Sequence, residues 1–270
     1  MTASWDKLPQ RPGSCAHVVE LIRPQERRAG ESAGRFLAGA LQNGGIAVAI
    51  ATPRNAGGII AQLARMGLDP VASLQRDRMM LMESAGTLAR FLHKGTVDPE
   101  EFDRTIGSAM RAVSERVGDK PVRAFGDMVG LLWQRGNRQA AADLERLWNG
   151  LQERLSFGLY CAYPIDIFQP EFSSVNVHGI LDTHTHLLPS GSSADLGRVL
   201  DRAIDEVLGE EAAQVRSRMG SRARYDSPAM PKPEQIILWL RSHVPDFAEA
   251  VLERARALYQ ASAPRVYLRS

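Results

Sequence analysis

Two histidines one residue apart, His184 and His186, are the most visible candidates for metal chemistry in this sequence. On a β-strand alternate side chains point to the same side, so both rings could hold one ion, as in metal-dependent hydrolases. A catalytic metal needs further convergent ligands, but the chain after His186 supplies one more histidine, His243, and looks helical. We therefore favour a strand end or loop whose histidines form local hydrogen bonds or line a pocket. A metal-dependent hydrolase that uses His184 and His186 is kept as an alternative.

Further polar residues lie where buried strands are expected to end. In a parallel sheet these carboxyl ends meet at one edge, where ligands bind. We expect a ligand there to contact both acidic and basic side chains, with His17 deeper in the sheet. Helix capping and turn formation are the alternative explanation for several of these residues, above all for Asp127. The candidate ligand-binding residues are His17, Arg23, Thr52, Arg54, Glu83, Arg123, Phe125, Asp127, Tyr163, His184 and His186.

The connection after the first expected strand reads RPQERRAGESAGRF and lacks the lysine of a phosphate-binding loop. A divergent nucleotide-binding ATPase is therefore a second alternative rather than the favoured function. A serine nucleophile motif is also missing, and Cys161 lies in an apolar run where a cysteine behaves as a small hydrophobe. The sequence indicates no particular cofactor.

The elements that would position these residues alternate between strand and helix. Apolar runs at 17–22, 46–52, 78–84, 121–126 and 157–164 predict strands. Helical spacing predicts helices at 31–45, 57–67, 85–93, 99–117, 127–135 and 138–154. Residues 46–52 are apolar on both faces, which is typical of a parallel strand covered on both sides. The prediction is a three-layer α/β domain with a mainly parallel sheet, plus C-terminal helices.

We place the α/β domain at residues 14–190 and a helical segment at 194–270. Residues 194–219 read as one amphipathic helix, and a helical pair split at Pro245 follows. The almost unbroken apolar run QIILWL suggests that this segment meets another surface, in a homodimer or with a signalling partner. Folding back over the α/β domain is the competing interpretation, and a helical scaffold or interaction protein is a further alternative function.

Composition limits the remaining functions. The chain has 270 residues and a net charge of +2, which gives no general attraction to nucleic acid or to anionic membranes. Its two cysteines form no disulfide framework, and no apolar run is long enough to span a bilayer. We expect a cytoplasmic protein that binds neither membranes nor nucleic acid directly.

Several strings together resemble the MEDS family, the methanogen/methylotroph sensory domains named after the regulator DcmR. The matching strings run collinearly over residues 14–190 and are HVVELI, FLAGALQNGGIAVAIATP, LMESAGTLARFL, DPEEFDRTIG, PVRAFGDMVGLLWQRGN, ADLERLWNGL, FGLYCAYPIDIF and HTHLLP. The segment RPQERRAG is more basic than the family pattern leads us to expect. The resemblance does not cover residues 195–270.

The resemblance implies a RecA/KaiC-like fold with a degenerate nucleotide site that lacks the phosphate-binding loop. It also implies a sensor of small, hydrocarbon-derived molecules, in a family often joined to DNA-binding or kinase domains. His184 and His186 fall in the family's own H-x-H-x-x-P string, so their likeness to hydrolase ligands is accidental on this interpretation. We predict a non-catalytic, ligand-responsive regulatory protein.

Overall fold

The computed structural model describes residues 16–23, 28–189, 193–221 and 230–262. Within these residues a six-stranded, wholly parallel sheet has the order β3-β2-β6-β7-β1-β8. The prediction of a parallel α/β fold from five apolar runs is confirmed, and β8 is an additional short strand. The strands are β1 (His17–Leu21), β2 (Ile46–Ala51), β3 (Met79–Glu83), β6 (Val122–Gly126), β7 (Gly158–Tyr163) and β8 (His186–Leu188).

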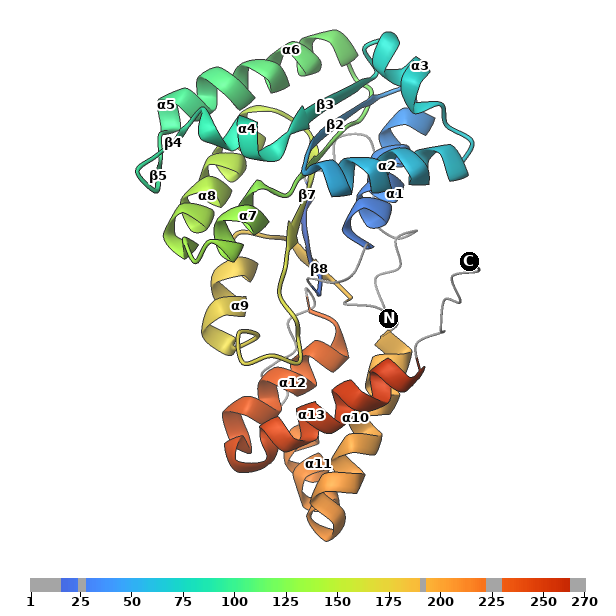
Figure 1. The fold of residues 1–270 in the computed structure, drawn as a ribbon, viewed down its shortest axis with the longest axis vertical. Coiled ribbons are helices and arrows are strands. Elements are labelled where there is room, and N and C mark those ends of the chain that lie inside the picture. Colours follow the sequence, from blue (N-terminus) through green and yellow to red (C-terminus); the bar gives the residue numbers. More distant parts are fainter. Residues whose placement is uncertain (1–15, 24–27, 190–192, 222–229, 263–270) are drawn as a thin grey trace. The chain divides into compact units, whose positions relative to one another are not determined.

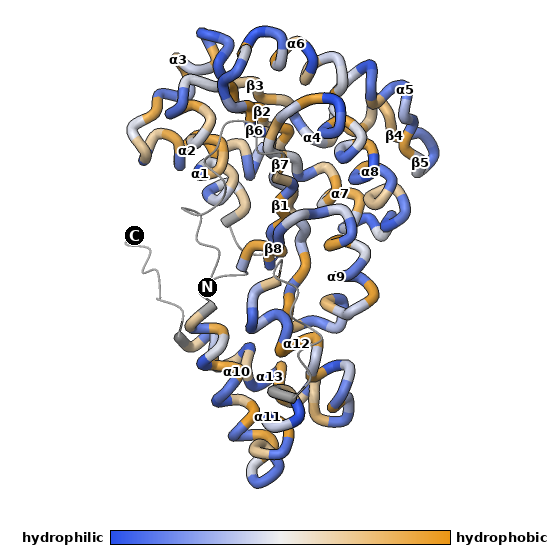
Figure 2. The backbone as a smooth tube through the Cα atoms, turned by 180° about the vertical axis from the view of Figure 1, so that it is seen from behind, coloured by the Kyte–Doolittle hydropathy of each residue, from blue (hydrophilic) through white to orange (hydrophobic). Residues whose placement is uncertain are grey.

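Helices cover both faces of this sheet (Figure 1). On one face, α1 (Arg28–Gln42) and α2 (Pro53–Arg65) pack against each other and on the alanines of β2. The other face carries α4 (Ser84–Ala89), α6 (Ser108–Val117), α7 (Met128–Gln134) and α8 (Arg138–Arg154). Figure 2 shows the central strands as apolar segments between these helices. Every residue of β2 is buried, as a strand covered on both sides requires.

The register of β1 against β7 decides which side chains share a face. Val19 lies opposite Cys161, so His17 and Tyr163, two residues away on their strands, face the same side as this pair. That side is the one covered by α8. Glu20 points to the other side, where Tyr160 donates a hydrogen bond to it.

Two predicted helices are interrupted. Helix α4 ends at Ala89, and a hairpin of β4 (Leu92–His93) and β5 (Thr96–Val97) follows. Lys94 and Gly95, at its tip, have φ of 51° and 82°, values that a two-residue hairpin turn requires. The stretch 99–117 contains α5 (Pro99–Phe102), a π-helical turn and then α6. Short-range apolar spacing does not register such breaks, so both stretches looked continuous.

The second compact unit contains residues 166–178, Pro189 and the described residues from 193 onward. The stretch predicted as one helix breaks at Gly209, whose φ is 51°, between α10 (Ser193–Leu208) and α11 (Ala212–Ser221). Helix α10 packs on α13 (Pro245–Ser262), and both contact α12 (Lys232–His243). Helix α9 (Ser174–Leu181) begins within this unit. The remaining described α-helix, α3 (Pro70–Gln75), belongs to the α/β unit.

The apolar run in α12 is buried within the chain. Ile237, Leu238, Trp239 and Leu240 are each at most 4% exposed. Of the run's apolar residues only Ile236 is partly exposed, so the run supplies little exposed apolar surface, and association with a second copy or a partner stays a prediction that this run does not support. The outer limits of the two predicted domains, residues 14 and 270, lie outside the described residues. Among the described helices, none has both the length and the apolar composition needed to cross a bilayer.

Candidate functional site

A cavity of about 310 Å³ opens at the carboxyl ends of β1, β2, β6 and β7. This is the edge of the sheet at which the sequence analysis predicts ligand binding. The lining combines apolar side chains, two arginines, an acid and a tyrosine. Residues 24–27 of the basic segment, which follow Arg23, lie outside the described residues. The lining residues are Ile22, Arg23, Ala29, Thr52, Arg54, Asn55, Asp127, Gly130, Leu131, Gln134, Ala162, Tyr163 and Pro164.

Asp127 is the buried acid of this pocket and is 5% exposed. Its Oδ2 accepts hydrogen bonds from the backbone N–H and the hydroxyl of Thr52, both at 2.9 Å, and from Asn55 Nδ2 at 2.8 Å. Its Oδ1 accepts from the Ser84 hydroxyl. Asp127 occupies the residue before α7 but makes no side-chain capping bond there, so the capping role expected from sequence is wrong. Its carboxylate instead ties the ends of β2, β3 and β6 together.

Six of the candidates lie outside the pocket lining, and three of these, Glu83, Arg123 and Phe125, have other structural roles. Glu83 accepts the backbone N–H groups of Ala85 and Gly86 and so caps α4, and these bonds lower the pKa of its carboxyl. Arg123 donates to the Phe36 carbonyl at 2.8 Å, and burial lowers the pKa of its guanidinium. Phe125 is fully buried in the core.

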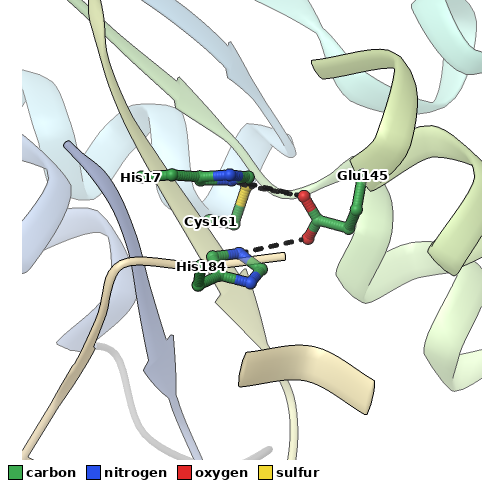
Figure 3. A group of neighbouring side chains, drawn as sticks. All are labelled: His17, Glu145, Cys161 and His184. Carbon is green, nitrogen blue, oxygen red and sulfur yellow. Dashed lines mark hydrogen bonds and ion pairs between the residues drawn. The ribbon is translucent and has the colours of Figure 1, made fainter. Parts of the chain in front are cut away.

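A second group of chemically active side chains lies deeper, on the α8 side of the sheet. His17, Glu145, Cys161 and His184 come from β1, α8, β7 and the turn before β8, and their side chains point toward one another (Figure 3). All are at most 8% exposed. One potential ligand atom from each lies within 4.8 Å of the others. We call these residues the buried cluster.

Glu145 lies at the centre of the cluster. Its Oε2 is 3.3 Å from His17 Nε2 and 3.7 Å from Cys161 Sγ, and its Oε1 is 3.3 Å from His184 Nε2. His17 Nε2 is also 3.4 Å from Cys161 Sγ. His184 Nε2 is buried, and its polar contact among the described residues is the ion-pair contact with Glu145 Oε1.

The ionisation of the cluster follows from burial and from these contacts. Burial alone would raise the pKa of Glu145, but His184 and His17 outweigh it and hold that pKa well below its usual range. Burial, reinforced by the negative charge of Glu145, raises the pKa of the Cys161 thiol well above its ordinary value. The same causes raise the pKa of Tyr163, whose hydroxyl donates to Glu145 Oε1 at 2.8 Å. Tyr163 thus touches both the buried cluster and the pocket.

The H-x-H pair is split by the backbone. Strand β8 begins at His186, which lies opposite Val18 and therefore on the α1 side of the sheet. His184 precedes the strand, in the turn after α9, and its ring reaches the α8 side beside His17 at 4.0 Å between ring centroids. The alternation rule assumed for a shared ion does not apply, and the structure brings His184 together with His17 instead.

Sequence reasoning missed Glu145 and read Cys161 as a small apolar residue. Glu145 lies on α8 near Leu144, Trp148 and Leu151, whose spacing predicts a helix face packed in the core. These three residues are indeed buried. The available signal was an acid inside an otherwise apolar helix face. The cluster combines imidazole, carboxylate and thiol groups, which together can bind a transition metal or hold a buried proton network.

Comparison with known proteins gives one positive result. Residues 17–185 match the family model described as MEDS, the methanogen/methylotroph, DcmR sensory domain, and this is more than half of the 270 residues. A search of curated proteins finds no match. The matched region begins at His17 and ends at Thr185, so it contains every strand except β8 and all four cluster residues. The resemblance seen in the sequence is confirmed, and this chain belongs to the MEDS family of sensory domains.

Proposed function

We propose that this protein is a non-catalytic sensor that binds a small organic molecule in the strand-end pocket and passes its bound state to a signalling partner. The observation that carries this proposal is the pocket itself, in a domain whose family is sensory. Its place at the carboxyl ends of parallel strands is where ligands of open α/β sheets bind. The fold is, on this proposal, RecA/KaiC-like with a degenerate nucleotide site.

The lining supports one class of ligand. Ile22, Ala29, Leu131 and Ala162 provide apolar surface, while Arg23 and Arg54 lie where a polar or anionic group would be bound. A cavity of about 310 Å³ is at the lower end of the range for small-molecule sites. These features support, as part of the proposal, a small hydrocarbon derivative with an apolar body and one polar or anionic group.

Asp127 supports a binding role rather than a catalytic one. Its carboxylate already accepts hydrogen bonds from Thr52, Asn55 and Ser84, so it holds the pocket wall in place. A ligand that displaces Thr52 or Asn55 would loosen the link between β2, β3 and β6. Binding would then shift the population between a state with tightly linked strand ends and a state with loosened ones. Such a shift can transmit the bound state to other parts of the protein.

Native mass spectrometry of the protein purified from cells tests this proposal. We expect a retained small molecule in the wild type, and its loss in Leu131→Trp, where the indole fills the cavity. Ile60→Trp is the matched control, because Ile60 lies on α2 with 37% of its surface exposed and outside the pocket lining. Thermal-shift titration with linear carboxylates and alcohols of increasing length should stabilise the wild type and Ile60→Trp, but not Leu131→Trp.

Two outcomes contradict the proposal. One is a wild type with neither a retained molecule nor any thermal shift with these probes. The other is magnesium-dependent ATP hydrolysis that is lost in Leu131→Trp, since this would make the pocket the site of a divergent ATPase. Turnover should therefore be measured on the same samples.

A further inference from the structure

We propose that His17, Glu145, Cys161 and His184 form a closed site for a divalent transition-metal ion of the zinc class. The site lies beneath the pocket, on the α8 side of the sheet, and is distinct from the ligand site proposed above. It would hold the start of β1, the middle of β7 and the turn before β8 against α8.

The hydrogen bonds behind the two imidazole rings set their tautomers. His184 Nδ1 is 2.7 Å from the Ile180 carbonyl oxygen, which can only accept, so this nitrogen carries a proton. His17 Nδ1 is 2.7 Å from Asn149 Oδ1, and Asn149 Nδ2 donates to the Thr183 carbonyl, which fixes the amide orientation. In neutral rings both Nε2 atoms then present lone pairs to the cluster. Metal-binding histidines are characteristically held in this way.

Four separations between potential ligand atoms fall in the range of a tetrahedral site, within a group whose ligand atoms all lie within 4.8 Å of one another. Zinc bonds of about 2.0–2.1 Å to nitrogen or oxygen and about 2.3 Å to sulfur place neighbouring ligand atoms roughly 3.3–3.8 Å apart. The nitrogen–oxygen contacts of His17 and His184 with Glu145 are both 3.3 Å. The sulfur of Cys161 lies 3.4 Å from His17 Nε2 and 3.7 Å from Glu145 Oε2. If both rings are neutral and no cation is bound, two lone pairs and a carboxylate face one another at these distances.

Charge balance selects a divalent ion. A carboxylate, a thiolate and two neutral imidazoles carry two negative charges, which one dication neutralises in a fully buried site. Binding breaks the Cys161 S–H bond, and that proton leaves to solvent as the sulfur–metal bond forms. The thiolate disfavours magnesium and calcium, which prefer oxygen ligands. Four buried protein ligands fill a tetrahedral shell, as in structural zinc sites rather than catalytic ones.

The first experiment measures metal content in the wild type. After loading with zinc and desalting, elemental analysis should find about one zinc ion per chain. Cobalt substitution should give the strong visible absorption of tetrahedral coordination and a sulfur-to-cobalt charge-transfer band in the near ultraviolet. Zinc should also raise the thermal midpoint of chelator-treated protein. None of these readouts depends on the identity of the sensed molecule.

Matched variants assign the ligands. Cys161→Ser should abolish the charge-transfer band, whereas Cys15→Ser should keep it. His184→Gln should lower zinc affinity by at least about tenfold, whereas His186→Gln should leave it unchanged, because His186 faces the other side of the sheet. Circular dichroism of each variant separates lost binding from lost folding.

Three results would overturn the site. They are a folded wild type that retains no zinc, a cobalt spectrum without a sulfur band, and equal losses in His184→Gln and His186→Gln. The first would mean that the cluster is an ion-pair network of protonated histidine and carboxylate. The last would restore the shared H-x-H ion that the spacing of His184 and His186 suggests.

Discussion

Asp127 shows how much of the pocket depends on one side chain. In Asp127→Asn one oxygen becomes an NH₂ group, which then faces the donors of Thr52, Asn55 or Ser84. We expect a loss of roughly 2–4 kcal/mol in the free energy of unfolding, measured by urea denaturation. Asp69→Asn is the control, because Asp69 accepts a single capping bond from Ala72 on an exposed turn and its loss should be about 1 kcal/mol or less. Equal losses in the two variants would show that the hydrogen bonds of Asp127 contribute no more to stability than one exposed capping bond.

At the same scale, the sequence identified the pocket better than the cluster. Arg23, Thr52, Arg54, Asp127 and Tyr163 line the pocket, because strand ends can be located from apolar runs alone. Whether they bind a ligand stays a prediction. The cluster could not be found this way, since its side chains belong to separate elements and share no local spacing. Only the register of β1 against β7 and the turn before β8 bring them together.

Among the elements, α7 approaches β7 unusually closely, and Gly130 permits this approach. A Cβ at this position would lie 2.6 Å from the Ala162 carbonyl oxygen, a backbone atom that cannot move aside cheaply. We expect Gly130→Ala to destabilise the protein by roughly 1–3 kcal/mol and to weaken ligand binding in the pocket that Gly130 lines.

Gly150, on α8, is the matched control for this prediction, because a Cβ there meets nothing within 4 Å. Gly150→Ala should stabilise the protein by about 0.5–1 kcal/mol through the better helix propensity of alanine. Thermal or urea unfolding measures both changes. If the two substitutions shift stability in the same direction, the close packing of α7 on β7 is not a constraint.

In the second unit, Glu206 connects α10 to α13. Hydrogen bonds from Arg254 and Arg202 lower the pKa of its carboxyl to about 2 from 4.5. A carboxyl with a lowered folded-state pKa stabilises the fold above its unfolded pKa, and this contribution is lost as pH falls from about 4.5 toward 2.

The prediction is that the thermal midpoint of the wild type falls more steeply over that pH window than the midpoint of Glu206→Gln. Glu210→Gln, at an exposed position on the turn after α10, should retain the wild-type slope. Identical slopes for all three proteins would show that the Glu206 contacts add nothing to stability.

Element boundaries were the least predictable part of the fold. Helix α8 was predicted at its observed bounds because a long amphipathic pattern ends clearly at both sides. The break at Gly209 depends on the positive φ of one residue, and helix α4 ends at Ala89 although apolar residues continue toward the hairpin. The short strand β8 was not predicted for a different reason, because three residues are too few to show an alternating apolar pattern.

At the scale of the whole molecule, residues 166–178 form one compact unit with the C-terminal helices, and a truncation can test whether they depend on these helices. The Phe172 carbonyl accepts a hydrogen bond from Arg241, and the ring of Phe168 lies 6.0 Å from that of Tyr259. Deleting residues 194–270 should expose both phenylalanines, which are buried in the full chain, and cause aggregation in light scattering. The same deletion with both replaced by serine should aggregate less.

A truncated chain that stays monomeric would show that these rings do not depend on the C-terminal helices. The mass of the full-length protein in the same measurement decides whether it forms the homodimer expected from the sequence. A monomer across micromolar concentrations would contradict that expectation.

The pairing of β1 with β8 also affects how the chain folds while it is being synthesised on the ribosome. The first strand of the sheet obtains its second neighbour only when His186–Leu188 has emerged from the exit tunnel. Until then a nascent chain that has already formed β1 and β7 presents β1, with its apolar sequence HVVEL, as an open sheet edge. While the residues up to β8 are being translated, a chaperone would thus protect the nascent chain from edge-to-edge aggregation.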